Sequence, residues 1–222
     1  MALLARSQPS DDHAPALEGT TNFRDVGGLH TATGAVVRPH RVYRSGVLDA
    51  QNGRARRALA GLGLRTIVDL RSDDEAACHE SYVPRRATRH HLPLGDPVDL
   101  GAFDRRRDPA DVSDRYLDLC LAASPSITAT FALLAAPSAY PVLVHGALGR
   151  DRTGVLVALV LRAIGVPALR IVGEYTRSAN TDPEAMLRFL GRIDDEFGSL
   201  TGYLRRLGIV GTIPFLGAAL LA

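Results

Sequence analysis

Lysine is missing from this chain, because all 26 basic residues among its 222 positions are arginine. We attribute this bias first to codon usage in a GC-rich genome. Arginine stays protonated at ordinary pH, so a catalytic lysine base or a Schiff-base amine is excluded. Cysteine is scarce as well: Cys78 and Cys120 provide neither a disulfide framework nor a Cys/His metal spacing, and we expect both to be small buried residues. No GxGxxG sequence and no Walker loop occurs, so neither a metal nor a nucleotide cofactor is expected.

Long hydrophobic runs and a large excess of one charge are also lacking. The formal net charge of +2 is too small to indicate nucleic-acid binding or a membrane surface, and neither partner is expected. The apolar start at Met1–Arg6 is too short for a signal peptide, and the apolar tail Phe215–Ala222 is well below the ~20 residues that span a bilayer. We interpret the tail as a terminal helix packed on the core rather than as a partner-docking segment. A cytoplasmic location is the default expectation, and no feature indicates the oligomeric state.

The composition, with 46% hydrophobic and 23% charged residues, is ordinary for a globular protein, and the length suits one large domain or two small ones. Residues 1–17 mix Ser, Pro, Asp and His without any period, which predicts a flexible N-terminal arm. Residues 18–222 are then expected to form a single domain. The polar segment 96–112 is predicted to be an exposed loop, in which the charge run Asp104–Asp108 is either solvated or acts as a lid.

Short apolar runs separated by helical stretches predict a mostly parallel central sheet flanked by helices. Thr153–Ile164 is apolar nearly all round, which predicts a buried helix. Thr181–Glu184 combines a cap, a proline and an acid and predicts a helix start. Pro39 suggests that Val36–Arg44 is an edge strand or contains a bulge. The other predicted strands are Thr66–Leu70, Arg89–Leu94 and Pro141–His145, and the other predicted helices are Asp49–Leu62, Ser113–Ala122 and Ser126–Ala136.

The segment from Gly146 to Gly154 connects a predicted strand to the predicted buried helix. A strand, a tight loop and a helix start together direct several backbone N–H groups and the positive end of a helix dipole at one place. Successive N–H groups form an anion nest, and Arg152 has the planar fork that binds two oxygens of a phosphate. The alternative interpretation is an exposed arginine on an ordinary helix start. The predicted anion-binding residues are Gly146, Ala147, Leu148, Gly149, Arg150, Arg152 and Thr153.

The sequence HGALGRDRTG (His145–Gly154) resembles the HCxxGKDRTG signature loop of the protein tyrosine phosphatase superfamily, in particular its bacterial and fungal tyrosine/serine phosphatase-like group. The resemblance covers roughly residues 18–210 and implies a cysteine-phosphatase-type α/β fold. It also implies that Asn22–Gly28 lies near the loop, that Asp151 is an acid for the leaving oxygen, and that His145 is a structural histidine bonded to the loop. The further segments that match this group in order are Asn22–Gly28, Tyr43–Ser45, Asp69–Arg71, Gly165–Pro167, Glu174-Tyr175, Gly198–Leu200 and Tyr203-Leu204.

One position departs from the resemblance, since the family's cysteine falls on Gly146, six residues before Arg152. Neither Cys78 nor Cys120 stands six residues before an arginine, and other loop positions also differ from the usual residues. Uncatalysed hydrolysis of phosphate monoesters needs ~10²¹-fold acceleration, whereas enzymes stripped of a catalytic unit retain only about 10³–10⁴. The sequence therefore predicts a pseudophosphatase that binds a phosphoprotein or a phosphorylated or anionic small molecule without ordinary cysteine-dependent turnover.

An enzyme of another class is the alternative hypothesis. The loop would hold an anionic small molecule for elimination, rearrangement or cyclisation, as in a biosynthetic pathway, and a nearby base would act on it. Whether the protein is a binder or a repurposed enzyme stays open at this point. The base candidates are Asp151, Asp25, His145 and the pair His90 and His91, each of which also has a purely structural interpretation.

The remaining site residues follow predicted strands or turns, where α/β sheets place their ligand sites. The predicted catalytic residues are Asp151 and Arg152. Arg44 and Arg71 are expected either to line the pocket or to form internal ion pairs with Asp25 or Asp69. The predicted supporting residues are Asp25, Arg24, His145 and Arg44.

Overall fold

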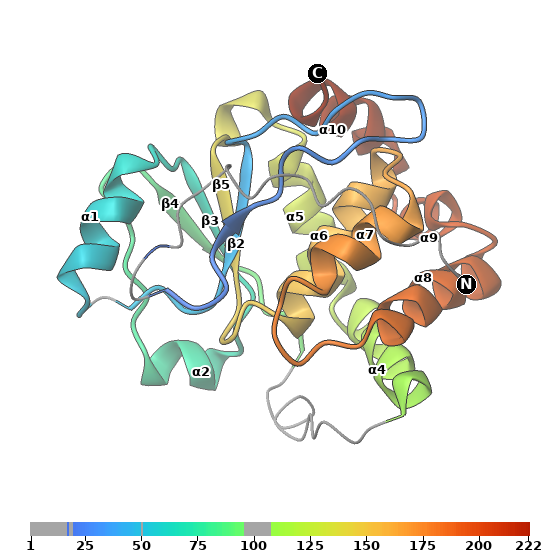
Figure 1. Ribbon diagram of the computed structural model, residues 1–222, viewed down its shortest axis with the longest axis horizontal. Coiled ribbons are helices and arrows are strands. Elements are labelled where there is room, and N and C mark those ends of the chain that lie inside the picture. Colours follow the sequence, from blue (N-terminus) through green and yellow to red (C-terminus); the bar gives the residue numbers. More distant parts are fainter. Residues whose placement is uncertain (1–16, 18–19, 50, 96–107) are drawn as a thin grey trace, which may run out of the picture.

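A computed structural model of the chain describes residue 17 and residues 20–49, 51–95 and 108–222. Its five-stranded sheet has the order β1-β2-β5-β3-β4 (Figure 1). β1 is antiparallel to β2, and every other neighbouring pair is parallel, which confirms the predicted mostly parallel sheet. The strands are β1 Arg24–Asp25, β2 Val42–Ser45, β3 Thr66–Asp69, β4 Thr88–His91 and β5 Val142–His145.

Helices cover both faces of this sheet. α1 lies on one side of the strands, whereas α5, α6 and α7 lie on the other (Figure 1). Of the predicted N-terminal arm only Leu17 is described, and its side chain is buried; the charge run up to residue 107 lies outside the described residues. The helices are α1 Gly53–Gly61, α2 Asp73–Cys78, α4 Pro109–Ala122, α5 Ser124–Leu134, α6 Asp151–Ala163, α7 Ala168–Tyr175, α8 Pro183–Phe197, α9 Leu200–Arg206 and α10 Ile213–Leu220, with 3-10 turns at Pro137–Ala139 and Val210–Thr212.

The strands divide the core into two clusters because successive side chains of a strand point to opposite faces. Ile67 of β3 and Leu143 of β5 pack in the smaller cluster with Leu59 of α1. Val68 and Val144, one residue further along each strand, belong to the larger cluster on the opposite face. A sheet that is buried on both faces requires near-continuous apolar strands, and these strands have that character.

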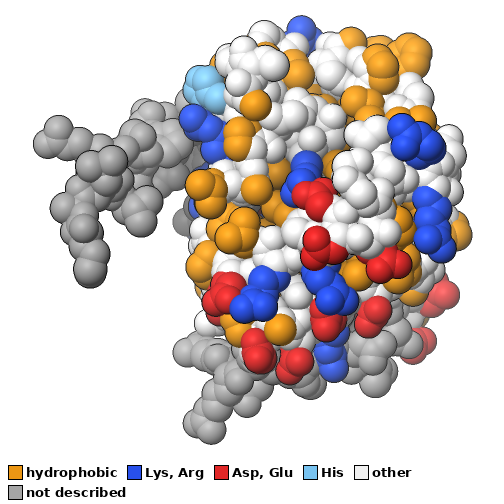
Figure 2. Space-filling model, turned by 90° about the vertical axis from the view of Figure 1, so that its right-hand side faces the viewer, with side chains coloured by type: hydrophobic (Ala, Val, Ile, Leu, Met, Phe, Trp, Pro, Cys, Tyr) orange, Lys and Arg blue, Asp and Glu red, His pale blue; other side chains and the backbone are white. Residues whose placement is uncertain are grey.

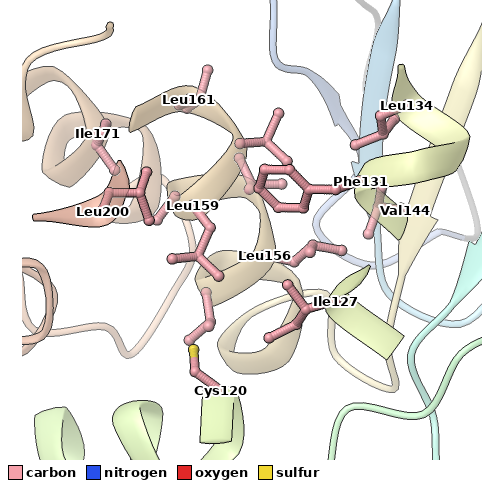
Figure 3. Close-up of a cluster of buried hydrophobic side chains, with 14 of the residues drawn as sticks. Cys120, Ile127, Phe131, Leu134, Val144, Leu156, Leu159, Leu161, Ile171 and Leu200 are labelled. Carbon is pink, nitrogen blue, oxygen red and sulfur yellow. The ribbon is translucent and has the colours of Figure 1, made fainter. Parts of the chain in front are cut away.

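Helix α6 is the centre of the larger cluster. Every residue from Arg152 to Leu161 is buried, as the apolar pattern predicts. Figure 3 shows Leu156 and Leu159 of this helix beside Ile127 and Phe131 of α5. The helix that begins directly after β5 is therefore held rigidly by the core.

The two cysteines have different environments. Cys120 is fully buried in the larger cluster (Figure 3), and burial raises the pKa of its thiol. Cys78 is exposed at the end of α2, so the prediction that both cysteines are buried was wrong for this one. α2 is a short helix on the surface, and none of its described residues is buried, which explains why Cys78 is exposed.

Several element boundaries differ from the predictions. α4 begins at Pro109 and so takes in the end of the predicted loop 96–112, α5 begins and ends two residues early, and β4 ends at His91 rather than at Leu94. Strand β2 begins at Val42 and lies between β1 and β5, so Val36–Arg44 is neither an edge strand nor a bulge. Pro39 lies in the turn before the strand, where its missing N–H costs no ladder bond. Helix α1 begins at Gly53 rather than at Asp49, because the Asn52 side chain accepts hydrogen bonds from the first free backbone N–H groups of the helix.

Other predicted features are confirmed. Asp182 caps α8 by accepting a hydrogen bond from the Glu184 N–H, as its Asp-Pro-Glu sequence indicates. The C-terminal tail forms α10, whose Leu216 and Leu220 are buried in the core. Among the helices described, no single one is long and apolar enough to span a membrane, although α4 and α5 reach that length and composition when taken together across a bend of 76°.

The surface formed by α4 and α8 carries both signs of charge. Figure 2 shows acidic and basic side chains intermixed on this side of the molecule. Glu184 pairs with Arg188 within α8, and Arg192 of α8 pairs with Asp114 of α4. Exposed pairs of this kind contribute little to stability, which therefore depends on the core.

The core at α5 gives a direct test of this packing. Phe131 is fully buried, and Phe131→Ala is expected to lower the free energy of unfolding by about 3–5 kcal/mol because it leaves a cavity. Phe215 is 62% exposed, so the same change there should stay within about 0.5 kcal/mol of the parent protein. Urea denaturation of both variants checks the prediction, and equal losses would contradict it.

Candidate functional site

The site is the loop that joins β5 to α6, named here the β5–α6 loop and made of Gly146–Arg150. β5 is the central strand of the sheet, so the loop leaves its carboxyl end with strands on both sides. Open α/β sheets bind ligands at such positions. α2 lies at the same end of the sheet, beside the start of α6 (Figure 1).

The loop carbonyl groups are held by donors from outside the loop. The Ala147 carbonyl accepts a hydrogen bond from the Val47 N–H at 3.0 Å. The Gly149 carbonyl accepts two, from Asn22 Nδ2 at 2.7 Å and from Arg44 Nη2 at 2.8 Å. Each carbonyl is thereby turned away from the interior of the loop.

Four backbone N–H groups of the loop are left for a ligand. Those of Gly146, Ala147, Leu148 and Gly149 meet no hydrogen-bond acceptor within the parts of the chain that the structure describes. Directly after them comes the start of α6, where unpaired N–H groups and the helix dipole add positive potential. A turn of free N–H groups at a helix start is an oxyanion-binding nest.

Gly149 is required by the loop geometry. Its φ of 66° lies in the left-handed region, and a Cβ atom at this position would lie 2.3 Å from the carbonyl carbon and oxygen of Ser45. No side chain fits at that distance from a fixed strand. The loop therefore approaches β2 at this point as closely as backbone allows.

A buried ion-pair cluster stands behind the loop. Glu174 of α7 accepts hydrogen bonds from Arg24 Nε at 2.7 Å and from Arg44 Nη1 at 2.5 Å. Burial opposes the charge of Glu174, but the two arginines outweigh it and lower the pKa of this carboxyl. Burial lowers the pKa of Arg24 to about 10, which leaves it protonated at neutral pH. Arg24 also bonds Ser178, which in turn accepts from the Asn22 amide.

This cluster corrects one prediction and confirms another. Arg44 pairs with Glu174 and not with Asp25, because its side chain is directed toward the carboxyl end of the sheet. Asp25 instead accepts from the backbone N–H groups of Gly27 and His40, so it holds the turn that precedes β2. Arg71 pairs with Asp69 at 2.7 Å, as expected.

Arg152 is clamped by a carboxylate that the sequence did not indicate. Its Nη1 and Nη2 atoms donate to the two oxygens of Glu75 at 2.6 and 2.7 Å, and Nη1 also donates to the Leu70 carbonyl at 3.3 Å. Glu75 lies on α2, where it also accepts from the Ser72 N–H in a capping box. Burial opposes ionisation of Glu75, but the hydrogen bonds from Arg152 outweigh it and lower the pKa of this carboxyl.

The clamp leaves one edge of the guanidinium for an anion. A guanidinium has five N–H donors, and three are used by Glu75 and Leu70. The two that remain are on Nε and Nη2, which form the side edge of the planar fork. A fork edge matches two oxygens of a phosphate or carboxylate. Arg152 can thus bind an oxyanion while Glu75 fixes its orientation.

His145 lies below the loop at the end of β5 and is completely buried. Its Nδ1 lies 3.3 Å from the Gly146 carbonyl, and its Nε2 lies 3.6 Å from Asp69. Burial lowers the pKa of His145 to about 4, against a smaller opposing effect of Asp69. The ring is therefore neutral at pH 7 and supports the loop from below. His91 contacts a different group, since its Nε2 lies 2.8 Å from the Arg71 carbonyl.

Asp151, the first residue of α6, is bound from two sides. It accepts a hydrogen bond from the Tyr116 hydroxyl at 2.8 Å and from Arg150 Nε at 2.9 Å. The Tyr175 hydroxyl lies 2.7 Å from that of Tyr116. Burial and the neighbouring Asp151 raise the pKa of Tyr116, so its hydroxyl stays protonated and can donate. These hydrogen bonds, which run from Tyr175 of α7 through Tyr116 of α4 to Asp151 of α6, fix the direction of the Asp151 carboxylate.

The fold therefore brings together most of the predicted site. Arg24, Arg44, His145 and Asp151 all lie against the loop or its supports, whereas Asp25 has a separate role. Sequence reasoning missed the roles of several residues, which are Asn22, Glu75, Tyr116, Glu174 and Ser178. Asn22 and Glu174 stood in segments that resemble the family, but their roles become clear only from the residues that they contact in the folded protein.

Known phosphatases are similar to this chain over most of its length. The tyrosine phosphatase family matches residues 15–182 of the chain. The triple specificity protein phosphatase PtpB of Mycobacterium tuberculosis is 32% identical over 212 residues, which cover 82% of this chain and 75% of that protein. A putative tyrosine-protein phosphatase of Cupriavidus necator is 31% identical over 193 residues, which cover 81% of this chain and 69% of that protein. The chain belongs to the tyrosine phosphatase family.

A solved structure was also found. The core catalytic domain of the PP-IP phosphatase SIW14 from S. cerevisiae, in complex with citrate, matches with a TM-score of 0.44 at 15% sequence identity. The match covers 76% of this chain and 89% of the other.

The close approach at Gly149 can be tested with a matched pair of glycines. Gly149→Ala is expected to lower the free energy of unfolding by several kcal/mol. This exceeds the ~1–2 kcal/mol that a left-handed backbone costs a residue with a side chain, because the added Cβ atom would also clash with Ser45. The variant should bind no phosphate. Gly208 has a similar φ of 74°, but a Cβ atom added there would meet no atom within 4 Å, so Gly208→Ala should show the backbone penalty alone. Thermal unfolding and phosphate titration of both variants decide between these outcomes.

The buried His145 predicts a pH dependence of stability. Its folded pKa of about 4 is below the ordinary value of 6.5, so its contribution is fully present above pH 6.5 and is lost as the pH falls toward 4. At about 1.4 kcal/mol for each pH unit, the loss approaches ~3 kcal/mol. His145→Gln should remove this part of the pH dependence. Urea denaturation of both proteins between about pH 7 and about pH 4.5 measures it, and parallel profiles would refute the assignment.

Proposed function

We propose that this member of the tyrosine phosphatase family binds a phosphorylated or otherwise anionic ligand at the β5–α6 loop without ordinary cysteine-dependent turnover. One observation carries the proposal: two loop carbonyls are held outward, that of Ala147 by the Val47 N–H and that of Gly149 by Arg44 and Asn22. The N–H groups of the same two peptides, those of Leu148 and Arg150, then face the other way. The clamped Arg152 adds a fork edge to the same place.

The lack of turnover rests on the residue at the start of the loop. Gly146 stands six residues before Arg152, where the resembling loops carry their cysteine, and glycine has no nucleophilic atom. Cys120 cannot replace it, because it lies on α4 with its side chain buried in the larger core cluster. Without covalent catalysis, binding and oxyanion stabilisation alone fall short of phosphatase rates by many orders of magnitude.

The ligand class follows from the donors. Free N–H groups, a helix dipole and a guanidinium edge favour a compact dianion with several oxygens over a neutral group. The named relatives are protein phosphatases, so a phosphoprotein is one source of this group and a phosphorylated small molecule is another. Both sources present the same phosphate to the loop.

A second candidate function is favoured by the position of Asp151. Of the base candidates in the sequence, this carboxylate lies at the loop itself, with its direction fixed by Tyr116. An anionic metabolite held by the loop would expose a neighbouring C–H or O–H bond to it. Elimination, rearrangement or cyclisation of such a substrate requires that placement and no covalent nucleophile.

The proposed binding function is tested by calorimetric titration with inorganic phosphate and phosphotyrosine. Replacing Arg152 together with its partner, as Arg152→Ala with Glu75→Gln, should weaken binding at least tenfold, since a charge-assisted fork contact is lost and no unpaired carboxylate is left. Arg188→Ala, on exposed α8, is the control and should bind as the parent does. Absence of any phosphate binding by the parent protein would refute the proposal.

The same samples separate the binder from both enzyme classes. The parent protein should release no phosphate from an aryl phosphate above the buffer rate, whereas efficient metal-independent release would contradict the lack of turnover. Product formation from an anionic metabolite, detected by mass spectrometry and lost in Asp151→Asn, would support the second candidate instead.

A further inference from the structure

The space above Gly146 is bounded by one polar atom. A Cβ atom at position 146 would lie 3.2 Å from Thr153 Oγ1, and apart from the adjoining residues no other atom of the described chain comes within 4 Å of it. Gly146 does not have the left-handed backbone that would explain a glycine there. The interior of the loop therefore has room at the position where a side chain of residue 146 would begin.

The hydroxyl of Thr153 is directed at this space and has no partner in the protein. Thr153 is completely buried, and its Oγ1 forms no hydrogen bond with any residue that the structure describes. A threonine within a helix usually bonds the carbonyl four residues earlier, which here is Gly149. That carbonyl already accepts from Asn22 and Arg44. Buried hydroxyls are nearly always hydrogen-bonded, so we expect the Thr153 hydroxyl to bond an atom of a ligand.

We propose that Gly146 and Thr153 form a subsite for a small nucleophile of one or two heavy atoms, of the thiolate or hydrosulfide class, beneath the bound phosphate. The inference rests on the proposed function in one respect, since the nucleophile acts on a phosphate that the β5–α6 loop holds. Thr153 Oγ1 donates to the guest, and the positive potential at the start of α6 favours its anionic form. The guest then occupies the position of the side chain that glycine lacks.

The chemistry of such a guest is a simple displacement at phosphorus. A lone pair of the thiolate sulfur forms an S–P bond, and the bond from phosphorus to the aryl oxygen breaks. The electron pair leaves on the aryl oxygen as a phenolate, so methanethiolate gives S-methyl phosphorothiolate and hydrosulfide gives thiophosphate. No oxidant or reductant takes part.

The test is chemical rescue with para-nitrophenyl phosphate, whose phenolate needs no added proton. Hydrosulfide and methanethiol should raise phenolate release by the parent protein at least tenfold over the same thiol without protein, with the phosphorothiolate or thiophosphate detected by phosphorus NMR. tert-Butanethiol, which is too bulky for the subsite, should give no such increase. Rescue that is independent of thiol size would overturn the inference.

Variants of the two subsite residues locate the effect. Gly146→Ala places a methyl group in the subsite and should abolish rescue. Thr153→Val, which removes only the hydroxyl, should lower the rescued rate about tenfold or more, whereas Thr153→Ser should retain it. A crystal soaked with bromide should show anomalous density above Gly146 in the parent and none in Gly146→Ala.

Phosphate affinity is titrated on every variant, so the two proposals fail separately. If the parent binds phosphate but shows neither rescue nor bromide density, the subsite is refuted and the binding function stands. If the parent binds no phosphate, the binding function fails. Bromide density above Gly146 would then still support the subsite on its own, and its absence would refute the subsite too.

Discussion

The direction of the Gly149 carbonyl is the constraint on which the rest of the site depends. Arg44 and Asn22 both donate to it, and the left-handed backbone of Gly149 allows the approach to β2 that brings these donors within reach. A peptide group is planar, so a carbonyl that points outward turns its N–H inward. The outward Gly149 carbonyl thus turns the Arg150 N–H inward, and the Ala147 carbonyl, held by the Val47 N–H, does the same for Leu148. These two peptides preform the proposed anion nest.

The charges around the loop are balanced so that the nest itself stays positive. Glu174 compensates Arg24 and Arg44 behind the loop, and Glu75 compensates Arg152 beside it. Buried arginines without such partners would be costly. Among the described residues, the Glu174 carboxylate bonds only Arg24 and Arg44, and Glu75 binds Arg152 through Nη1 and Nη2. Neither carboxylate contacts the loop N–H groups or the Nε edge of Arg152. The acids therefore orient the cations without occupying the place of the ligand.

The side chain at position 146, where the loop begins, matters for cleaving a phosphate but not for binding one. The donors that bind an oxyanion belong to the backbone and to Arg152, and they do not depend on the side chain of residue 146. Cleavage by the family's covalent route does depend on it. Position 146 holds glycine, and the Thr153 hydroxyl is directed into the space there. In the proposed function the fold therefore retains the electrostatic part of the chemistry, and in the further inference another molecule supplies the nucleophile.

The sequence by itself determined the parallel sheet, the buried α6 and the anion loop, because hydrophobic period, helix caps and a strand–loop–helix connection are local signals. It also predicted an anion-binding role for Arg152 from its place at the start of that helix, and an acid role for Asp151 from the resemblance to the phosphatase loop; both stay predictions. It did not reveal Glu75, Glu174 or the contact of Asn22 with Gly149, and the ion pair that it offered for Arg44, with Asp25 or Asp69, was wrong. These pairs join residues 77 to 150 positions apart in the chain. Only the tertiary structure decided them, since a salt bridge between distant positions has no spacing of its own and is selected by which helices pack around the end of the sheet.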